Sequence, residues 1–192
     1  MARSPVVNQV GLAREAFLAR GGEAGDESTL GLCLETVRPR GHAPCWSGLS
    51  EDDGMLLEAW VDEYFDSISE LHTHVACGLC RESAAEFRQH GSPGMVRHLY
   101  ARKADAVACF REGWIIVECK PTADHRALGQ LLFYRHHLRK VTACLVNPRL
   151  LILCTECDED FREVMLAHGV EVCVVSFAGG VGRITKWAQP SR

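Results

Sequence analysis

The feature that most constrains the fold is a pair of apolar, strand-like segments, residues 95–110 and 113–120, joined by the short polar stretch Arg111–Gly113. Two such segments separated by so few residues, one of them Gly, predict an antiparallel β-hairpin. The first segment contains a single acidic residue, Asp105, and the second ends in Glu118–Lys120, whose sequence is Glu-Cys-Lys. Carboxylates at strand positions where apolar residues would pack better indicate a chemical role.

Helical and strand-like segments alternate around this hairpin. A first helix is expected within residues 50–71, with Ser50 or Asp52 as its N-cap and apolar residues at helical spacing up to Ile68. Further helical segments are expected at residues 81–89, 124–140 and 158–169, and further strands at residues 143–146, 149–154 and 170–177. This order predicts an α/β fold in which helices cover both faces of a mixed β-sheet.

The chain divides into an N-terminal extension, residues 1–53, and a main domain, residues 54–192. The extension contains a helical candidate at residues 9–19 and a strand candidate at residues 30–37, and each is followed by a stretch rich in Gly, Pro or Ser. A length of 192 residues suits one domain of ordinary size with such an appendage.

Composition and charge exclude several classes of protein. The net charge of −4 argues against a chain that is basic throughout, so contact with nucleic acid has to be local. The N-terminus has no continuous apolar signal region, and no apolar run is long enough to cross a bilayer. We therefore expect an intracellular protein, cytoplasmic or nuclear, without membrane contact and with its ten cysteines reduced or bound to metal. The oligomeric state stays open, a dimer included.

The acidic residues of the hairpin form a candidate metal site. Asp105 and Glu118 lie on adjacent predicted strands, and two carboxylates with the backbone carbonyl of Cys119 suit Mg²⁺, or Mn²⁺, which prefer oxygen ligands. Lys120 points to the same face as Glu118, because side chains alternate along a strand. Its ammonium group could orient an attacking water or offset charge on a phosphate. The alternative is a pair of surface carboxylates with Lys120 as a salt-bridge partner.

Together these residues resemble the signature of the PD-(D/E)xK nuclease superfamily, an Asp and a (Asp/Glu)-x-Lys on consecutive strands. Gln130-x-x-x-Tyr134 on the following helix is similar to the motif of the RecB-like branch. The resemblance covers residues 54–177, and Ala104 stands where the superfamily name has Pro. Glu58 resembles the carboxylate that many members carry on their first helix, although Glu63 competes for this role.

The resemblance implies a restriction-endonuclease-like core of the αβββαβ type and a metal-dependent nuclease, with DNA favoured over RNA. It implies catalytic roles for Glu58, Asp105, Glu118 and Lys120, with Gln130 and Tyr134 orienting the lysine or the phosphate. The reaction would leave a 5′-phosphate and a 3′-hydroxyl. The alternatives are a non-catalytic nucleic-acid-binding or assembly module of the same fold, and a zinc- or thiol-based protein.

Two further groups of residues suggest ligands. Cys77-x-x-Cys80 has the spacing of a zinc knuckle, and His42-x-x-Cys45 could supply the other two ligands of a structural Zn²⁺ site; buried reduced thiols are the alternative. A basic helical patch is the candidate nucleic-acid-binding surface, with a solvated helix face as its alternative; its members are Arg135, Arg139 and Lys140.

Overall fold

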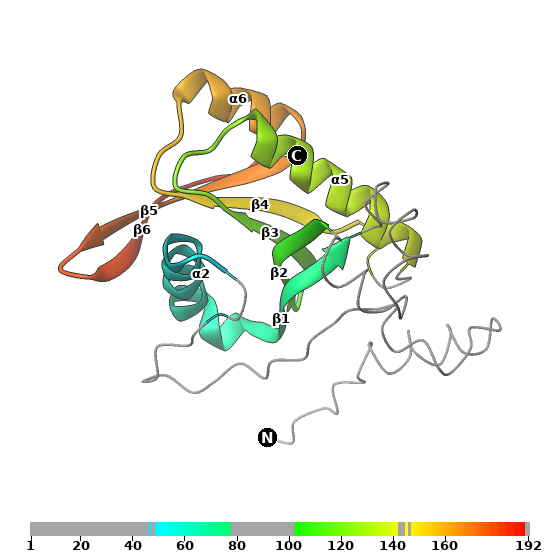
Figure 1. Ribbon diagram of the computed structural model, residues 1–192, viewed down its shortest axis with the longest axis horizontal. Coiled ribbons are helices and arrows are strands. Elements are labelled where there is room, and N and C mark those ends of the chain that lie inside the picture. Colours follow the sequence, from blue (N-terminus) through cyan, green and yellow to red (C-terminus); the bar gives the residue numbers. More distant parts are fainter. Residues whose placement is uncertain (1–45, 47–48, 78–101, 142–144, 146, 191–192) are drawn as a thin grey trace, which may run out of the picture.

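The computed structural model describes residue 46 and residues 49–77, 102–141, 145 and 147–190 (Figure 1). The elements expected at residues 9–19, 30–37 and 81–89 lie outside these ranges, as does nearly all of the N-terminal extension and most of the strand expected at residues 143–146. The division of the chain into an extension and a main domain therefore stays a prediction.

The described residues form one six-stranded mixed sheet with helices on both faces, as the sequence predicts. In chain order the elements are α2 (Glu51–Tyr64), the 3₁₀ turn η2 (Phe65–Ser67), β1 (Ile68–Cys77), β2 (Arg102–Phe110), β3 (Gly113–Cys119), α5 (His125–Val141), β4 (Arg149–Cys154), α6 (Glu159–Ala167), β5 (Val170–Ala178) and β6 (Val181–Ala188). The strands lie side by side in the same order. β3, β4 and β5 are parallel, and the other neighbouring pairs are antiparallel.

The predicted hairpin is confirmed. β2 and β3 pair antiparallel from Ala106↔Val117 to Phe110↔Gly113, and the turn lies at Arg111 and Glu112. Gly113 has φ +129°, a backbone conformation that residues other than glycine rarely adopt. The glycine therefore allows the tight turn between β2 and β3.

Two strands were not predicted from the sequence. The first predicted helix was expected to reach Ile68, but the helix ends at Tyr64 and Ile68 begins β1. The alternation of β1 is hidden by polar residues, because His72 and Thr73 are buried there as well as apolar ones. β6 is a largely exposed edge strand, and its sequence VGRITKWA lacks the regular alternation of apolar and polar residues that predicts a strand.

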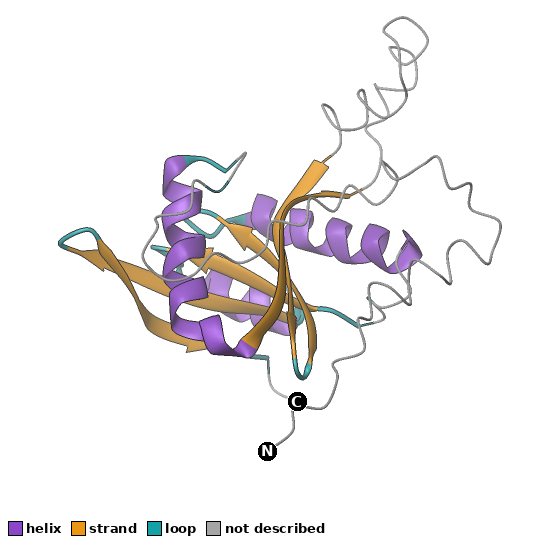
Figure 2. Ribbon diagram, turned by 90° about the horizontal axis from the view of Figure 1, so that it is seen from below, coloured by secondary structure: helices purple, strands orange, loops and turns teal. Residues whose placement is uncertain are grey.

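Two hydrophobic layers enclose the sheet (Figures 1 and 2). On one face α2 packs through Leu57 and Trp60, which are fully buried against the apolar side chains of β3, β4 and β5. On the other face α5 and α6 bury Leu131 and Met165. β6 approaches α2 so closely that a Cβ atom on Gly182 would lie 2.5 Å from the Cβ atom of Ala59, so only glycine fits there.

The helix starts are defined by side-chain caps. Ser50 Oγ accepts a hydrogen bond from the backbone N–H of Asp53, which confirms Ser50 rather than Asp52 as the N-cap of α2. Asp124 Oδ1 accepts from the N–H groups of Arg126 and Ala127 at the start of α5. Within the described residues, none of the helices has the length and apolar character needed to cross a bilayer.

Candidate active site

The acidic residues of the hairpin meet at the edge of the sheet where β3 ends. Asp105 and Glu118 each lie one residue beyond the Ala106–Val117 pair, so they stand opposite each other on neighbouring antiparallel strands. Glu118 has only 1% of its surface exposed and Asp105 9%. The structure therefore brings together two buried carboxylates that the sequence separates by a hairpin.

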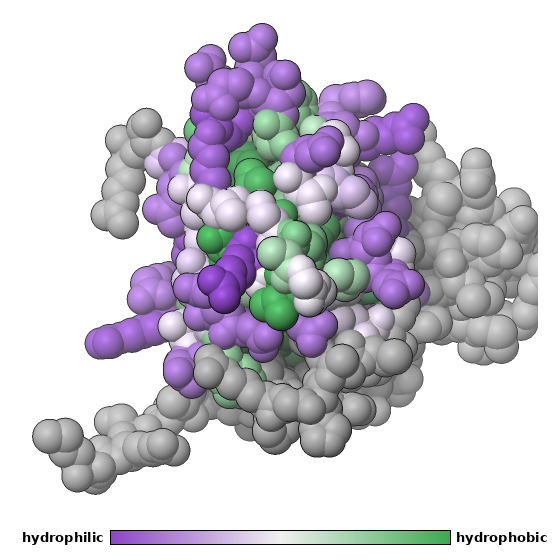
Figure 3. Space-filling model, turned by 90° about the vertical axis from the view of Figure 1, so that its left-hand side faces the viewer, coloured by the Kyte–Doolittle hydropathy of each residue, from purple (hydrophilic) through white to green (hydrophobic). Residues whose placement is uncertain are grey.

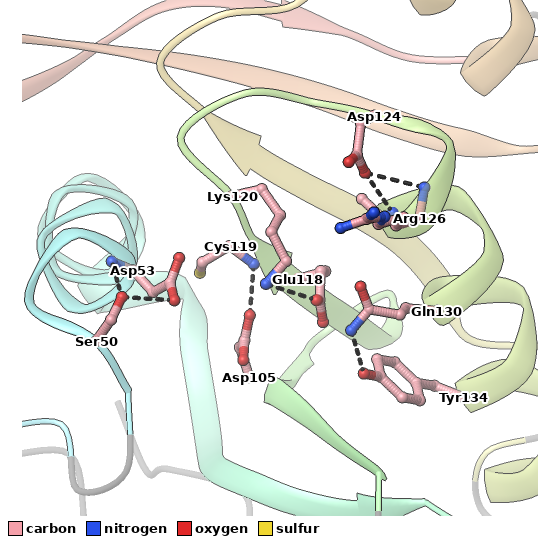
Figure 4. A network of polar contacts seen from close by, with 11 residues as sticks. Ser50, Asp53, Asp105, Glu118, Cys119, Lys120, Asp124, Arg126, Gln130 and Tyr134 are labelled. Atoms are coloured by element: carbon pink, nitrogen blue, oxygen red, sulfur yellow. Dashed lines mark hydrogen bonds and ion pairs between the residues drawn. The ribbon is translucent and has the colours of Figure 1, made fainter.

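Polar contacts fix part of this pair and leave part of it without a partner (Figure 4). Asp105 Oδ2 accepts a hydrogen bond of 2.7 Å from the backbone N–H of Cys119. Lys120 Nζ lies 3.0 Å from Glu118 Oε1, and the lysine side chain is 31% exposed. Glu118 Oε2 is buried and has no hydrogen-bond partner among the described residues. One lysine therefore faces two buried carboxylates, which leaves an excess of negative charge.

The charge imbalance is visible in the pKa values. Burial raises the pKa of Asp105 to about 6, although the Cys119 N–H and Lys120 act in the opposite direction. Burial and the nearby charge of Asp105 raise the pKa of Glu118 to about 8, against the effect of Lys120. Burial alone would lower the pKa of Lys120, but Glu118 and Asp105 outweigh it and raise the pKa. A bound cation would remove the cost of ionising both carboxylates.

Backbone contacts hold Lys120 at the end of β3. Its N–H donates to the carbonyl of Leu153 on β4 over 2.9 Å, which continues the parallel pairing of the two strands by one residue. The carbonyl of Pro121 accepts from Thr155 N, Glu156 N and Thr155 Oγ1 at 2.9, 3.0 and 2.7 Å. The loop after β3 and the loop after β4 are therefore joined, and the Lys120 backbone has a fixed position beside the carboxylates.

The Gln130–Tyr134 pair lies beside the same carboxylates. Gln130 Nε2 donates to Tyr134 Oη over 3.0 Å, and both side chains point from α5 toward Glu118 (Figure 4). Tyr134 is buried, and burial followed by the charge of Glu118 raises the pKa of its hydroxyl. Tyr134 is therefore a neutral hydroxyl that is ordered by Gln130 near the acidic pair.

The helix carboxylate that acts on this cluster is Asp53, which the sequence did not single out. The charge of Asp53 raises the pKa of Asp105, Glu118 and Lys120, and its Oδ2 accepts a hydrogen bond from Ser50 Oγ (Figure 4). Glu58 lies farther along α2, and its pKa is raised by burial and by Asp62. Helical periodicity alone could not choose between them, because the choice depends on how α2 crosses the sheet.

β1 is distorted beside Asp105. His74 has φ +54°, and among the described residues other than glycine it has no counterpart with positive φ. The β1–β2 register pairs Thr73 with Ala106 and Val75 with Ala104, so His74 stands opposite Asp105. The strand also changes faces here, because Leu71 belongs to the α2 layer and Val75 to the α5 layer. Residues in such conformations cluster at functional sites.

The predicted zinc site cannot be placed. His42, Cys45 and Cys80 lie outside the described residues. Cys77 is buried at the end of β1, its thiol donates to the carbonyl of Val75, and burial raises its pKa to about 12. Residues 46, 49–77, 102–141, 145 and 147–190 include no group of three or more His, Cys, Asp or Glu side chains that could hold a metal ion.

The predicted basic patch lies toward the other end of α5. Arg139 and Lys140 are exposed in its last turn, where positive charge stabilises a helix. The rise of a helix separates Arg139 from Gln130 by about 13 Å along the axis. The helix therefore gives Arg139 and Lys140 a structural reason for their charge, and binding of nucleic acid by the patch stays a prediction.

Comparison of the chain with protein-family models, with curated proteins and with solved structures found no match.

Proposed function

We propose that this protein is a Mg²⁺-dependent nuclease that hydrolyses phosphodiester bonds at the edge of the sheet where β3 ends. The observation that carries the proposal is the buried pair Asp105–Glu118, with Oε2 of Glu118 unpartnered and Lys120 as the adjacent cation. Ionising both buried carboxylates beside a single lysine costs stability, and a bound cation would remove that cost.

The chemistry of these groups fits Mg²⁺. The unpartnered Oε2 of Glu118 and the second oxygen of Asp105 are hard oxygen atoms that suit this ion, and Cys119, whose carbonyl is the third candidate ligand, directly follows Glu118 in the sequence. Mg²⁺ is commonly bound by one or two carboxylates and keeps several waters, so a site with few protein ligands suits it. Asp53, whose carboxylate is bonded to Ser50, can contribute through a water.

The metal ion and the neighbouring side chains would have different roles in the reaction. Bound Mg²⁺ supplies charge that polarises a phosphoryl oxygen and lowers the pKa of a water. Lys120 keeps its proton at neutral pH and is partly exposed, so its ammonium group can orient the water or stabilise charge on the phosphate. Tyr134 accepts a hydrogen bond from Gln130 and keeps its own proton, so its hydroxyl can donate a hydrogen bond to the substrate.

The arrangement of the elements supports the same proposal. Among the described residues, the order of α2, the antiparallel strands β1–β3, α5 and β4 matches the αβββαβ order of a restriction-endonuclease-like core. The site lies at the edge toward which β4 and β5 run, on the left of Figure 1. Figure 3 views that side and shows hydrophilic side chains around a smaller hydrophobic area.

The test is a cleavage assay on single-stranded DNA, duplex DNA and RNA with Mg²⁺ or Mn²⁺, and with a chelator. We expect cleavage that needs the metal, and products with a 5′-phosphate. Lys120→Ala should lose turnover and still bind Mg²⁺, because it supplies charge rather than a ligand atom. Arg111→Ala, in the exposed turn at the opposite end of β3, is the matched control.

Two outcomes would contradict the proposal. Cleavage that persists in chelator would exclude the metal site as its source. Binding of nucleic acid by the wild-type protein without cleavage would favour the non-catalytic module instead, in which the same fold holds nucleic acid but does not hydrolyse it.

A further inference from the structure

The first turn of α5 carries positive charge, whereas the first turns of α2 and α6 carry negative charge. α2 has Glu51, Asp52 and Asp53 in its first turn, and α6 has Glu159 and Asp160. α5 begins with His125 and Arg126 and has no acidic residue in its first turn. Because the amino end of a helix is the positive end of its dipole, a cation there lowers the stability of the helix. Helix stability therefore does not explain Arg126.

Arg126 lies on the same side of α5 as the two residues that face the acidic pair. Arg126, Gln130 and Tyr134 are spaced four residues apart, which places them in one row along the helix. Figure 4 shows all three side chains on the side of α5 that faces Glu118 and Lys120. One turn of the helix, about 6 Å, separates Arg126 from Gln130 along the axis.

The guanidinium group of Arg126 is available for a ligand. Arg126 is exposed, and no ion pair to it occurs among the described residues. The nearest acidic side chain in the sequence, Asp124, uses Oδ1 to cap the backbone N–H groups of Arg126 and Ala127, both at 2.9 Å. Among the described residues Arg126 thus has no side-chain partner, and it lies in the same row as the two residues beside Glu118.

We propose that Arg126 binds a phosphate of the nucleic-acid strand next to the phosphate that reacts. This inference rests on the proposed nuclease function and extends it, because it names the part of the substrate that is held outside the metal site. Guanidinium groups bind phosphate oxygens through two parallel hydrogen bonds, which position a strand without reading its sequence. Arg126 is thus a positioning residue. Its contact with the phosphate does not depend on the identity of the neighbouring bases.

The experiment compares Arg126→Ala, Arg126→Lys and the control Arg111→Ala, each in the full chain. Steady-state cleavage of a DNA oligonucleotide gives KM and kcat, and binding of the same oligonucleotide to the Lys120→Ala background gives the salt dependence. We expect Arg126→Ala to raise KM about tenfold and to change kcat less than about threefold. The slope of log binding constant against log salt concentration should become shallower by about one unit, the change expected for the loss of one phosphate contact. Arg126→Lys should restore the slope but only part of the KM, since a lysine keeps the charge without the two-bond geometry.

The outcomes separate this inference from the function on which it rests. A wild-type KM and salt slope in Arg126→Ala, with cleavage intact, would overturn the role of Arg126 alone. A fall in kcat with unchanged KM would also overturn it, because Arg126 would then act on the reacting phosphate or on the fold. If the wild-type protein binds the oligonucleotide but cleaves nothing, the nuclease proposal fails while the salt slopes still decide whether Arg126 holds a phosphate. Absence of binding by the wild-type protein would overturn both.

Discussion

Two buried carboxylate sites lie at opposite ends of the same parallel strands, and they are built in opposite ways. At the amino end, Glu171 of β5 accepts hydrogen bonds from Arg149 Nε and Nη2 at 2.5 and 2.7 Å, from Trp187 Nε1 at 2.9 Å and from Gln189 Nε2 at 3.3 Å. At the carboxyl end, Glu118 has Lys120 on one oxygen and nothing among the described residues on the other.

The difference teaches what each site is for. Both glutamates are nearly inaccessible, with 4% exposure for Glu171 and 1% for Glu118. The protein therefore has the means to satisfy a buried carboxylate completely, and it does so where the charge only joins strands β4, β5 and β6. We infer that the unsatisfied carboxylate at the other end is kept for a ligand.

The largest expected effect separates the two sites by activity. If Asp105 is a metal ligand as proposed, Asp105→Asn should reduce Mg²⁺-dependent cleavage at least about a thousandfold, equivalent to about 4 kcal/mol in the transition state. Glu171→Gln is the control and should cleave normally per folded molecule, since Glu171 lies at the other end of the strands. Steady-state rates at saturating Mg²⁺ decide the point, and equal losses in both variants would erase the contrast.

The next largest effect compares the two carboxylate sites by their contribution to stability. Arg149→Met should lower the free energy of unfolding by about 1–3 kcal/mol, because it leaves the buried Glu171 without its counter-ion while solvent around the partly exposed Arg149 screens the pair. Urea denaturation without Mg²⁺ measures this loss. Lys120→Met is the matched change at the carboxyl end, and its loss should be smaller because protonation of Glu118, whose pKa is raised to about 8, relieves the unpaired charge. A loss as large as that of Arg149→Met would show that both sites depend equally on a counter-ion.

A moderate effect concerns pH. Burial raises the pKa of Asp105 to about 6 and that of Glu118 to about 8, so the folded protein holds protons that the unfolded chain releases near pH 4. Stability without metal should therefore fall as pH rises from about 4 to about 8, and Mg²⁺ should restore more stability at pH 8 than at pH 5.

Thermal unfolding at several pH values, with and without Mg²⁺, measures this dependence. Glu118→Gln should flatten the profile and raise stability at pH 8 by about 1–3 kcal/mol, because it removes a buried charge with an unpaired oxygen. An unchanged profile in that variant would mean that other groups govern the pH dependence.

The smallest effect tests how complete the pairing at Glu171 is. Trp187→Phe removes one hydrogen bond to Glu171 and should cost about 1 kcal/mol, because Arg149 and Gln189 remain. Urea denaturation measures the change. The ring of Tyr64 makes an edge-on contact with Trp187, with ring centroids 4.9 Å apart, and we expect the phenyl ring of the variant to keep this contact. A loss above about 3 kcal/mol would show that Glu171 is less redundantly held than its contacts indicate.

Local patterns were enough to predict the carboxyl-end site. Strand alternation and a short turn place Asp105, Glu118 and Lys120 together, because a hairpin fixes its own register within a few residues. The α/β fold followed from the order of segments. Glu171 and Arg149 could not be paired from the sequence, because their contact depends on the register of two parallel strands that are joined through α6.

The positions of the helices across the sheet also could not be predicted from the sequence. Asp53 and Glu58 both lie on α2, and only the packing of that helix against the sheet decides which of them is near Asp105. β1 was missed because its buried positions include His72 and Thr73, and a pattern of polar residues does not reveal that a partner strand covers them.

The left-handed backbone of His74 limits which sequences this protein can have. Only Gly, Asn, Asp and a few other residues adopt φ near +54° at small cost, and a β-branched residue such as Val is strongly disfavoured. Saturation mutagenesis at position 74 should thus give a tolerance profile typical of a turn in the middle of a strand. A search for distant relatives can use this rule: a residue that tolerates a left-handed backbone on one strand should stand opposite the Asp of the next strand, whatever the number of residues between them.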